Sequence, residues 1–328
     1  MPTNLPPEYF EVEKRYRAAR SPEEKLALLQ ELLSTIPKHK GTEKLRGDLK
    51  KRLARLKAAA QSPRGASRRA SAFHVEREGA GQVVVVGPTN VGKSALLTAL
   101  TNATPKVSAS PYTTWTPTAG MMPIADIQVQ LVDTPPLGRG FVQPELFELI
   151  KRSDLILLVV DLLTDPLQQI EETAALLEEH RIVPRHRQDR YPGQERLTFL
   201  PVIVLANKDD GPDSDELFAI LSGLVEAEWT LIPVSATAGR NFERLKELVF
   251  EQLDIVRVYS KAPGREPDLA APFVLKRGST VADLAAKVHH DFVEKLKMAR
   301  IWGTALYDGQ PVQQDHVLHD GDVVELHM

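Results

Sequence analysis

The middle of the chain alternates continuous apolar runs with amphipathic stretches. The runs at 83–86, 155–160 and 202–206 consist of Val, Ile, Leu and Ala. Short continuous apolar runs of this length are typical of strands that are buried on both faces of a sheet. The stretches between them carry apolar residues at helical spacing. This alternation over residues 80–254 predicts an α/β fold, in which helices cover both faces of a mostly parallel sheet and right-handed crossovers join the strands.

The N-terminal part of the chain has a helical pattern. A capping box at 21–24, with Ser21 as N-cap and Glu24 at the third helical position, predicts the start of one helix. A second helix is predicted from about Thr42, and its apolar stripe consists of Leu45, Leu49, Leu53 and Leu56. We therefore expect a helical region over residues 1–60. Residues 61–79 are rich in Ser, Arg, Gly and Ala, which predicts a linker or arm.

The C-terminal part, residues 255–328, has a third pattern. Two predicted strands are followed by a helix that a capping box at 280–283 opens and that extends to about His290, and further short strands end the chain. This order predicts a small ubiquitin-like β-grasp domain. Within the α/β part, the polar stretch 185–194 interrupts the alternation, and we expect it to be a surface loop beside the base pocket.

Charge is distributed unevenly along the chain. The net charge is −3, but residues 1–79 contain 18 Lys and Arg against 10 Asp and Glu, a net of +8, so the remainder carries −3 − 8 = −11. A basic segment of this kind indicates a polyanionic partner, although a solvated helix face has the same composition. There is no cysteine, which excludes disulfides and thiolate metal sites. The start resembles no secretory signal and the longest apolar run is too short to cross a bilayer, so we expect a cytoplasmic protein without a membrane partner.

The most informative motif is a phosphate-binding loop. Residues 87–94, GPTNVGKS, match the pattern G-x-x-x-x-G-K-[ST] between a predicted strand and a predicted helix. The glycines allow successive N–H groups to point at one centre, and the helix N-terminus adds partial positive charge. Lys93 is expected to reach the β- and γ-phosphates, and the Ser94 hydroxyl to bind Mg²⁺. The nucleotide-binding candidates in this segment are Gly87, Pro88, Thr89, Asn90, Val91, Gly92, Lys93, Ser94 and Ala95.

A second motif indicates which base is bound. The strand 202–206 ends in an N-K-x-D sequence, whose last residue, Asp210, accepts from guanine N1–H and from the 2-amino group. Adenine has neither donor and would leave the carboxylate unpaired, which is unfavourable. The first residue of the motif is expected to tie this loop to the phosphate loop, and the lysine stem to cover the base. After the strand 231–234, a backbone N–H is expected to meet guanine O6. The base-binding candidates are Asn207, Lys208, Asp210, Ser235 and Ala236.

Two further segments complete the set expected around a nucleoside triphosphate. The strand 127–132 leads to Asp133, whose carboxylate is placed to hold Mg²⁺ through a water molecule. The polar segment 112–116, YTTWT, contains a threonine that is able to reach Mg²⁺ and the γ-phosphate.

Together these motifs resemble the Obg-type and developmentally regulated GTP-binding proteins, within the translation-factor-related GTPases. Residues 112–115 followed by Gly120 are similar to the F-T-T-L segment and glycine of that group. The resemblance implies the switch-one role for Thr114, the Mg²⁺ role for Ser94 and the guanine role for Asn207 and Asp210. The catalytic candidates are Lys93, Thr114 and Asp133. Residues 288–303 resemble a TGS domain, which implies that the β-grasp region is one.

The family pattern leaves the roles of the segment around Pro136 and of Asn90 open. Pro136 stands where the family has the glycine of D-x-P-G, and proline has no N–H for the γ-phosphate. Hydrolysis is therefore expected to be slow, unless Gly138 or Gly140 supplies the contact. Leu137 stands where many small GTPases place a Gln that orients water. Asn90 occupies the position that helps to bind K⁺ in potassium-activated relatives, and the alternative is that it only caps the loop.

We therefore expect a Mg²⁺-dependent GTPase that hydrolyses GTP to GDP and phosphate and acts as a nucleotide-dependent switch. The resemblance implies a ribosome or structured RNA as partner, bound through the basic N-terminal region and the TGS domain. The alternative, which Pro136 motivates, is a GTP-gated interaction adaptor with negligible hydrolysis. A P-loop ATPase is disfavoured by the N-K-x-D motif.

Overall fold

The computed structural model divides into two units, residues 1–71 and 72–328. It describes residues 12, 28, 31, 32, 35, 75–101, 117–138, 143–289, 292, 296–304 and 307–327. The two predicted N-terminal helices, apart from isolated positions, lie outside the described residues. So do most of the predicted arm 61–79, the whole segment 112–116 and Gly140.

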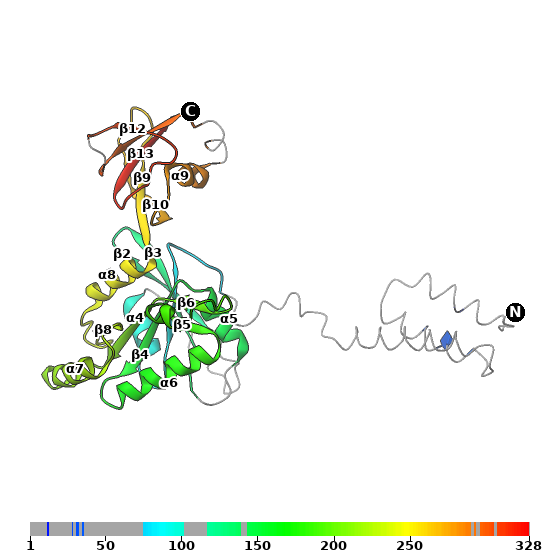
Figure 1. Ribbon diagram of the computed structural model, residues 1–328, viewed down its shortest axis with the longest axis vertical. Coiled ribbons are helices and arrows are strands. Elements are labelled where there is room, and N and C mark those ends of the chain that lie inside the picture. Colours follow the sequence, from blue (N-terminus) through cyan, green and yellow to red (C-terminus); the bar gives the residue numbers. More distant parts are fainter. Residues whose placement is uncertain are drawn as a thin grey trace. The chain divides into compact units, whose positions relative to one another are not determined.

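A six-stranded sheet forms the centre of the second unit (Figure 1). Its strand order is β2-β3-β1-β4-β7-β8, and every neighbouring pair is parallel except β2 and β3. The strands are β1 (Gln82–Val86), β2 (Thr118–Ile124), β3 (Ile127–Asp133), β4 (Leu155–Asp161), β7 (Val202–Asn207) and β8 (Thr230–Pro233). The predicted fold class, a mostly parallel α/β sheet, is confirmed.

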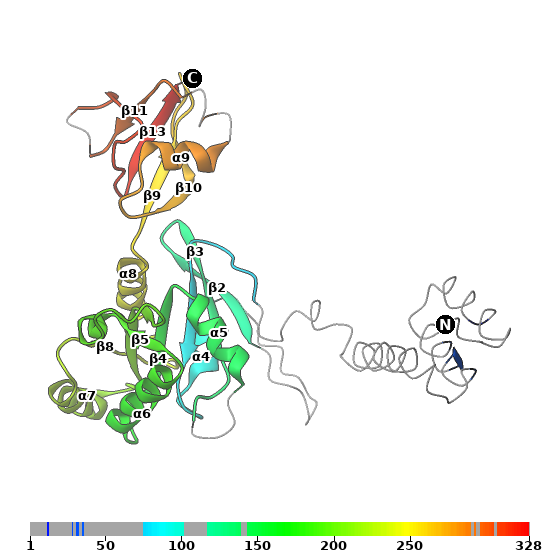
Figure 2. The same cartoon turned by 45° about the vertical axis from the view of Figure 1, so that its right-hand side comes forward.

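Helices cover both faces of this sheet, as Figures 1 and 2 show. One face packs against α4 (Lys93–Leu100) and α8 (Phe242–Leu253). The other packs against α5 (Pro144–Arg152), α6 (Pro166–Glu179) and α7 (Pro212–Leu224). The last three helices each begin with proline, which suits the first helical position because its N–H would have no partner there. At α6, the Asp165 carboxylate also accepts from the Gln168 N–H at 3.2 Å.

The unbroken valines of β1 are explained by this layering. Val84 and Val86 point into the cluster beneath α5, α6 and α7, whereas Val83 and Val85 point into the cluster beneath α4 and α8. All four are buried. Because a buried valine contributes about 1.5–3 kcal/mol relative to an exposed one, a polar residue on either side would destabilise this strand. Both alternating sets must therefore be apolar.

A second, smaller sheet follows along the chain. Its order is β10-β9-β13-β11-β12, with β9 and β13 parallel and the other pairs antiparallel. Its elements are β9 (Ile255–Ser260), β10 (Asp268–Lys276), α9 (Val281–Val288), β11 (Met298–Trp302), β12 (Gln310–Val312) and β13 (Asp322–His327). At the start of α9 the Thr280 N–H donates to Asp283 Oδ2 at 2.7 Å, so the predicted capping box is present. One helix packed on a mixed sheet of this order is the expected β-grasp.

Arg257 on β9 connects the two sheets. Its guanidinium donates to Asp126, in the turn between β2 and β3, and to Asp320, next to β13, each at 2.7 Å. The Tyr259 hydroxyl also donates to Asp126, at 2.5 Å. Hydrogen bonds from Tyr259 and Arg257 outweigh burial and hold the pKa of the Asp126 carboxyl below its ordinary value. The β2–β3 turn is therefore fixed to the β-grasp part by charge-assisted hydrogen bonds.

The expectation for residues 185–194 is correct in that most of them are exposed, but it is wrong about their conformation and their place in the fold. Here β5 (Ile182–Pro184) and β6 (Thr198–Leu200) form a small parallel sheet around the 3₁₀ helix η1 (Arg185–Arg190). Arg187 pairs with Glu178 near the C-terminal end of α6 at 2.8 Å. Since α6 begins after the carboxyl end of β4, this end lies away from the ligand edge of the sheet. The rings of His186 and Trp229 are in contact, with centroids 4.6 Å apart. The polar sequence of this stretch did not predict that contact.

Every helix within the described residues is too short or too polar to span a membrane.

Candidate functional site

The phosphate loop needs its two glycines for steric reasons. Gly87 and Gly92 have φ values of 146° and 93°, which side chains disfavour. A Cβ at Gly87 would lie 2.2 Å from the Val159 carbonyl oxygen, and one at Gly92 would lie 2.3 Å from Asn207 Nδ2. The loop is therefore pressed against β4 and against the N-K-x-D segment, and larger residues at these two positions would push it away from both.

Lys93 begins α4 and is folded back over the loop. Its ammonium donates to the carbonyl oxygens of Gly87 at 3.0 Å and Pro88 at 2.6 Å. The side chain is buried, which lowers its pKa, while the charge of Asp133 opposes this shift. The charge is thus held at the loop that the motif assigns to phosphate.

Ser94 and Asp133 meet beside this loop. The serine hydroxyl donates to Asp133 Oδ2 at 2.5 Å, and the carboxylate lies buried at the end of β3. The other oxygen, Oδ1, is buried and makes no hydrogen bond with the described residues. Burial raises the pKa of the Asp133 carboxyl, although the Ser94 hydroxyl and Lys93 counteract it. An unpaired anionic oxygen next to a hydroxyl is a donor set that suits a hard cation such as Mg²⁺.

Asn207, at the end of β7, joins three loops. Its side-chain Nδ2 donates to the Val91 carbonyl oxygen at 2.7 Å, and its Oδ1 accepts from the Ala236 N–H at 3.2 Å. The residue is buried. One amide therefore fixes the phosphate loop, the N-K-x-D segment and the loop after β8 relative to one another.

The Asp210 carboxylate is held by two hydroxyl groups. Oδ1 accepts from Ser235 Oγ at 2.5 Å and from Thr237 Oγ1 at 2.8 Å. These hydrogen bonds, first that of Ser235, lower the pKa of the carboxyl. Thr237 was not among the predicted site residues. In the sequence, only a second hydroxyl residue two positions after Ser235 indicates it. The role of Thr237 becomes evident from its hydrogen bond to Asp210.

Lys208 has a partner that the motifs did not reveal. Its backbone is left-handed, with φ 71°, and its ammonium pairs with Asp161 Oδ2 at 2.6 Å. Asp161 ends β4 and also accepts from the Leu163 N–H at 3.0 Å. The lysine side chain is thereby directed across the carboxyl end of the sheet. No spacing rule connects residues 161 and 208, so this pair could not be predicted from the motifs.

The segment after Asp133 is arranged differently from the family pattern. Pro136 is exposed, and the next N–H, that of Leu137, donates to the Gly87 carbonyl oxygen at 3.0 Å. The Leu137 side chain is buried. Gly138 is exposed and lines a pocket of about 330 Å³ together with Pro88 and Thr89. Pro136 has no N–H, and the N–H of Leu137 is already used, so Gly138 is the next described residue with an N–H along this segment.

Asn90 lies at the exposed tip of the phosphate loop in the left-handed region, with φ 65°. Asparagine tolerates this conformation better than most residues. This placement fits both a loop-shaping role and a cation ligand. Thr114, the predicted switch-one residue, lies outside the described residues.

Comparisons with known proteins bear on the family of the chain. A family model described as 50S ribosome-binding GTPase matches residues 82–191, and the TGS domain model matches residues 256–328. An uncharacterized GTP-binding protein of Methanocaldococcus jannaschii is 31% identical over 93% of this chain and 92% of its own length. Developmentally-regulated GTP-binding protein 1 of Xenopus laevis is 26% identical over 92% of this chain and 98% of its own.

A solved structure shares the fold. The YchF GTPase of Schizosaccharomyces pombe superposes with a TM-score of 0.52 and 13% identity, over 78% of this chain and 99% of that one. At this identity the likeness concerns the fold alone. The relatives that match nearly the full length are named GTP-binding proteins or developmentally regulated G-proteins. The resemblance inferred from the motifs is thus confirmed: the chain belongs to the family of GTP-binding proteins that combine a P-loop GTPase domain with a C-terminal TGS domain.

Proposed function

We propose that this GTP-binding protein hydrolyses GTP slowly to GDP and phosphate and acts as a switch between its two nucleotide states. The observation that carries the proposal is the joint arrangement of Lys93, Ser94 and Asp133 at the phosphate loop and of Asp210 in the N-K-x-D segment. Asn207 of that segment is hydrogen-bonded to the phosphate loop and to the loop after β8. Such an arrangement favours positioning and charge stabilisation, which are the main contributions to phosphoryl transfer.

The proposal includes Mg²⁺. The buried, unpaired Oδ1 of Asp133 beside the Ser94 hydroxyl fits this ion. Ser94 would bind it directly, Asp133 through a water molecule, and Thr114 is proposed as a further ligand. When bound, the ion would neutralise part of the charge on the β- and γ-phosphates.

The chain's own residues bind and orient the nucleotide. The Lys93 ammonium exchanges its carbonyl partners for phosphate oxygens, and the backbone N–H groups of the loop and the start of α4 hold the phosphates. Asp210 holds the base through the oxygen that the two hydroxyls leave unused. The Ala236 backbone beside Asn207 approaches the O6 edge. The switch segments that contain Thr114 and Asp133 would respond to loss of the γ-phosphate.

The second candidate is a GTP-gated adaptor with negligible turnover, and Pro136 is the observation that favours it. In this proposal the protein binds GTP and changes partners but does not need hydrolysis. Both candidates predict guanine-nucleotide binding, so binding alone does not separate them. The P-loop ATPase alternative would be revealed by competition from ATP.

Single-turnover hydrolysis of bound GTP separates the two candidates. We expect slow hydrolysis by the wild type, and faster hydrolysis by Pro136→Gly because the variant restores the missing N–H. Removing one donor from such a site typically changes the rate by about 10²–10³-fold. The control is Pro135→Ala, which lies next to it and leaves that N–H position unchanged. A wild type with no turnover above buffer would establish the adaptor.

We further propose that the partner is the ribosome or structured RNA, in the cytoplasm. The support is the +8 charge of residues 1–79 and the presence of the TGS domain. Lys and Arg in the segment 44–57 would contact phosphates, and the TGS domain would provide a second point of attachment.

A further inference from the structure

Helix α7 has two apolar stripes, of which one packs against the protein core and the other is exposed to solvent. Leu221 is buried and Phe218 is half-buried against the core. Leu217, Ile220 and Leu224 are exposed by 41%, 60% and 62%. Their spacing of three and four residues places these three side chains on one side of the helix. Three large apolar side chains gathered in this way are typical of an interaction site rather than of an ordinary surface.

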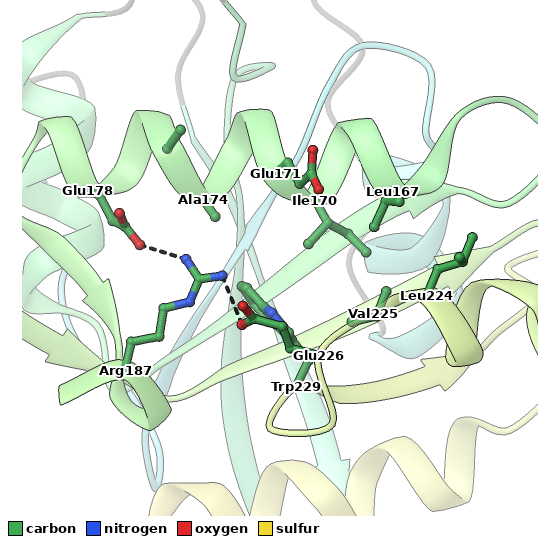
Figure 3. Close-up of a pocket in the computed structure, with 11 residues that line it drawn as sticks. Leu167, Ile170, Glu171, Ala174, Glu178, Arg187, Leu224, Val225, Glu226 and Trp229 are labelled. Carbon is green, nitrogen blue, oxygen red and sulfur yellow. Dashed lines mark hydrogen bonds and ion pairs between the residues drawn. The ribbon is translucent and has the colours of Figure 1, made fainter. Parts of the chain in front are cut away.

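A pocket lies at the end of this stripe (Figure 3). It has a volume of about 190 Å³. Its apolar lining comes from α6, from the end of α7 and from the segment between α7 and β8, and consists of Leu167, Ile170, Ala174, Ala175, Leu224, Val225 and Trp229. Leu224 belongs to both the stripe and the pocket, so the two form one surface, which we name the α6–α7 face.

Arg187 forms the polar boundary of this pocket. In Figure 3 its guanidinium lies between Glu178 and Glu226, next to Trp229. It donates to Glu178 at 2.8 Å and to Glu226 at 3.3 Å, and it lies over the Trp229 ring at 5.2 Å from the centroid. These contacts hold the pocket in shape and use the charge of Arg187, so the pocket is suited to an apolar group rather than to an anion.

Acidic residues predominate around the α6–α7 face. The segment 166–179 contains four acidic residues and the segment 212–229 contains five, and neither contains Lys, Arg or His. Arg187 and Arg190 offset Glu226, Arg187 offsets Glu178, and Arg240 pairs with Asp215. Other acidic residues of the two segments are Glu171, Glu179, Asp213, Glu216 and Glu228.

We propose that the α6–α7 face is the docking site for a partner protein helix that has an apolar stripe flanked by Lys and Arg. Leu217 and Leu224 are seven residues apart, about 10 Å along the helix, which matches two turns of a helix laid alongside. One large apolar side chain of the partner enters the pocket, and its basic residues meet the acidic rim. Such helix-in-groove binding uses a few buried anchors.

The acidic residues around the face favour a basic partner helix over RNA, an anionic membrane or a second copy of this chain. An RNA or an anionic membrane would be repelled by the acidic rim. The same face of a second copy carries the same acidic rim, which disfavours symmetric pairing of the two faces. The site is therefore distinct from the RNA contact proposed above, and its test does not depend on hydrolysis.

The test uses the full chain and three designed 18-residue peptides. The first is a helix with a Leu stripe flanked by Lys. The second replaces each Leu by Ser at the same charge, and the third replaces each Lys by Glu. Fluorescence anisotropy of labelled peptides gives their affinities, and hydrogen exchange locates the contact. We expect the first peptide to bind at least about tenfold more tightly than either of the others and to protect residues 212–229.

Two variants test the stripe and the pocket separately. Replacing Leu217, Ile220 and Leu224 together by Ser removes the stripe without changing charge. Ala175→Phe fills the mouth of the pocket from an exposed position of α6. Each variant should weaken binding of the first peptide at least about fivefold, the range expected for an interface anchor. Leu269→Ser, an equally exposed leucine of β10, is the matched control and should bind as the wild type does.

Four results would overturn the proposal. The first two are that the second peptide, or the third, binds as tightly as the first peptide. The other two are that neither variant binds the first peptide more weakly than the wild type does, or that the first peptide protects residues other than 212–229 from hydrogen exchange. A fifth result concerns self-association. If sedimentation shows a different oligomeric state for the triple Ser variant than for the wild type and the Leu269→Ser control, the face is an interface between copies of this chain. Thermal unfolding of every variant, with and without GDP, shows whether it is folded.

Discussion

At the scale of single residues, two hydroxyl groups hold the carboxylate that we propose for the base pocket. Ser235 and Thr237 both donate to the same oxygen of Asp210, so the carboxylate has a fixed plane before any base arrives. We expect a fixed acceptor to select guanine, because a base without matching donors would leave the second carboxylate oxygen unpaired. The lowered pKa of this carboxyl means that it remains ionised as the pH falls below its ordinary range.

Asp210→Asn tests this assignment. We expect weaker binding of GTP by roughly 2–4 kcal/mol, because a charge-assisted hydrogen bond is replaced by a mismatched amide. Xanthosine triphosphate should now be preferred, since its 2-oxo group accepts where guanine donates. Titration of both nucleotides measures the change, and Asp213→Asn, a nearby exposed aspartate of α7, is the control. Unchanged affinity of Asp210→Asn for GTP would remove Asp210 from the base pocket.

Substitution of Asn90 tests whether a monovalent cation accelerates GTP turnover. If it binds K⁺ near the phosphates, GTP turnover should be faster in KCl than in NaCl or choline chloride at equal ionic strength. Asn90→Gly is the cleanest variant, because glycine adopts the φ of 65° without strain, whereas alanine does not. It should remove the difference between the salts. The same rate in all three salts would leave Asn90 with a loop-shaping role.

At the scale of elements, the sequence pattern predicted the strands β1, β3, β4, β7 and β8 of the large sheet, but not the antiparallel β2. Unbroken valines in β1 require helices on both faces, and each motif followed a strand, as ligand loops do in parallel sheets. Residues 185–194 were misread because their packing depends on Trp229, some 40 positions further on. Asp161 and Thr237 were missed for the same reason: each acts through a side chain that is near in space but follows no local spacing.

The contact between Asp126 and Arg257 belongs to the same scale, because it joins a turn to a different sheet. Asp126→Asn should destabilise the protein by about 1–2 kcal/mol in thermal unfolding, since two charge-assisted hydrogen bonds are weakened. Glu247→Gln, which breaks an exposed pair with Arg244, should change stability little.

The pH dependence of this contact has a defined sign. The pKa values of Asp126 and Asp320 lie below their ordinary value in the folded protein. The stabilisation is therefore full above about pH 4, the ordinary aspartate value, and is lost as the pH falls through the lower folded value. The difference in stability between wild type and Asp126→Asn should consequently shrink in acid. A constant difference down to about pH 2 would show that the charge of Asp126 has no part in it.

At the scale of the whole molecule, opposite charges occupy different parts of one chain. Residues 1–79 carry +8 and the remainder −11, so a polyanion and a basic protein helix would use different surfaces. The acidic residues of the α6–α7 face would also disfavour nucleic acid on that side of the GTPase domain. The partner of the basic segment is therefore best identified by its dependence on salt, which reports phosphate contacts directly.

Binding to structured RNA or to ribosomes should fall steeply as salt rises. If about six phosphates are met, affinity should decrease by about 10³ between low and moderate salt, because the bound cations of the nucleic acid are released. Four substitutions in the full chain, Lys50→Gln, Lys51→Gln, Arg52→Gln and Arg55→Gln, should weaken binding and flatten this slope. The matched control replaces four exposed arginines of the GTPase domain, Arg152, Arg181, Arg185 and Arg196, by Gln. Filter binding at a series of KCl concentrations measures both slopes. Equal slopes for the two quadruple variants would mean that the basic segment is only a solvated surface, and the adaptor function would then be the better explanation of the molecule.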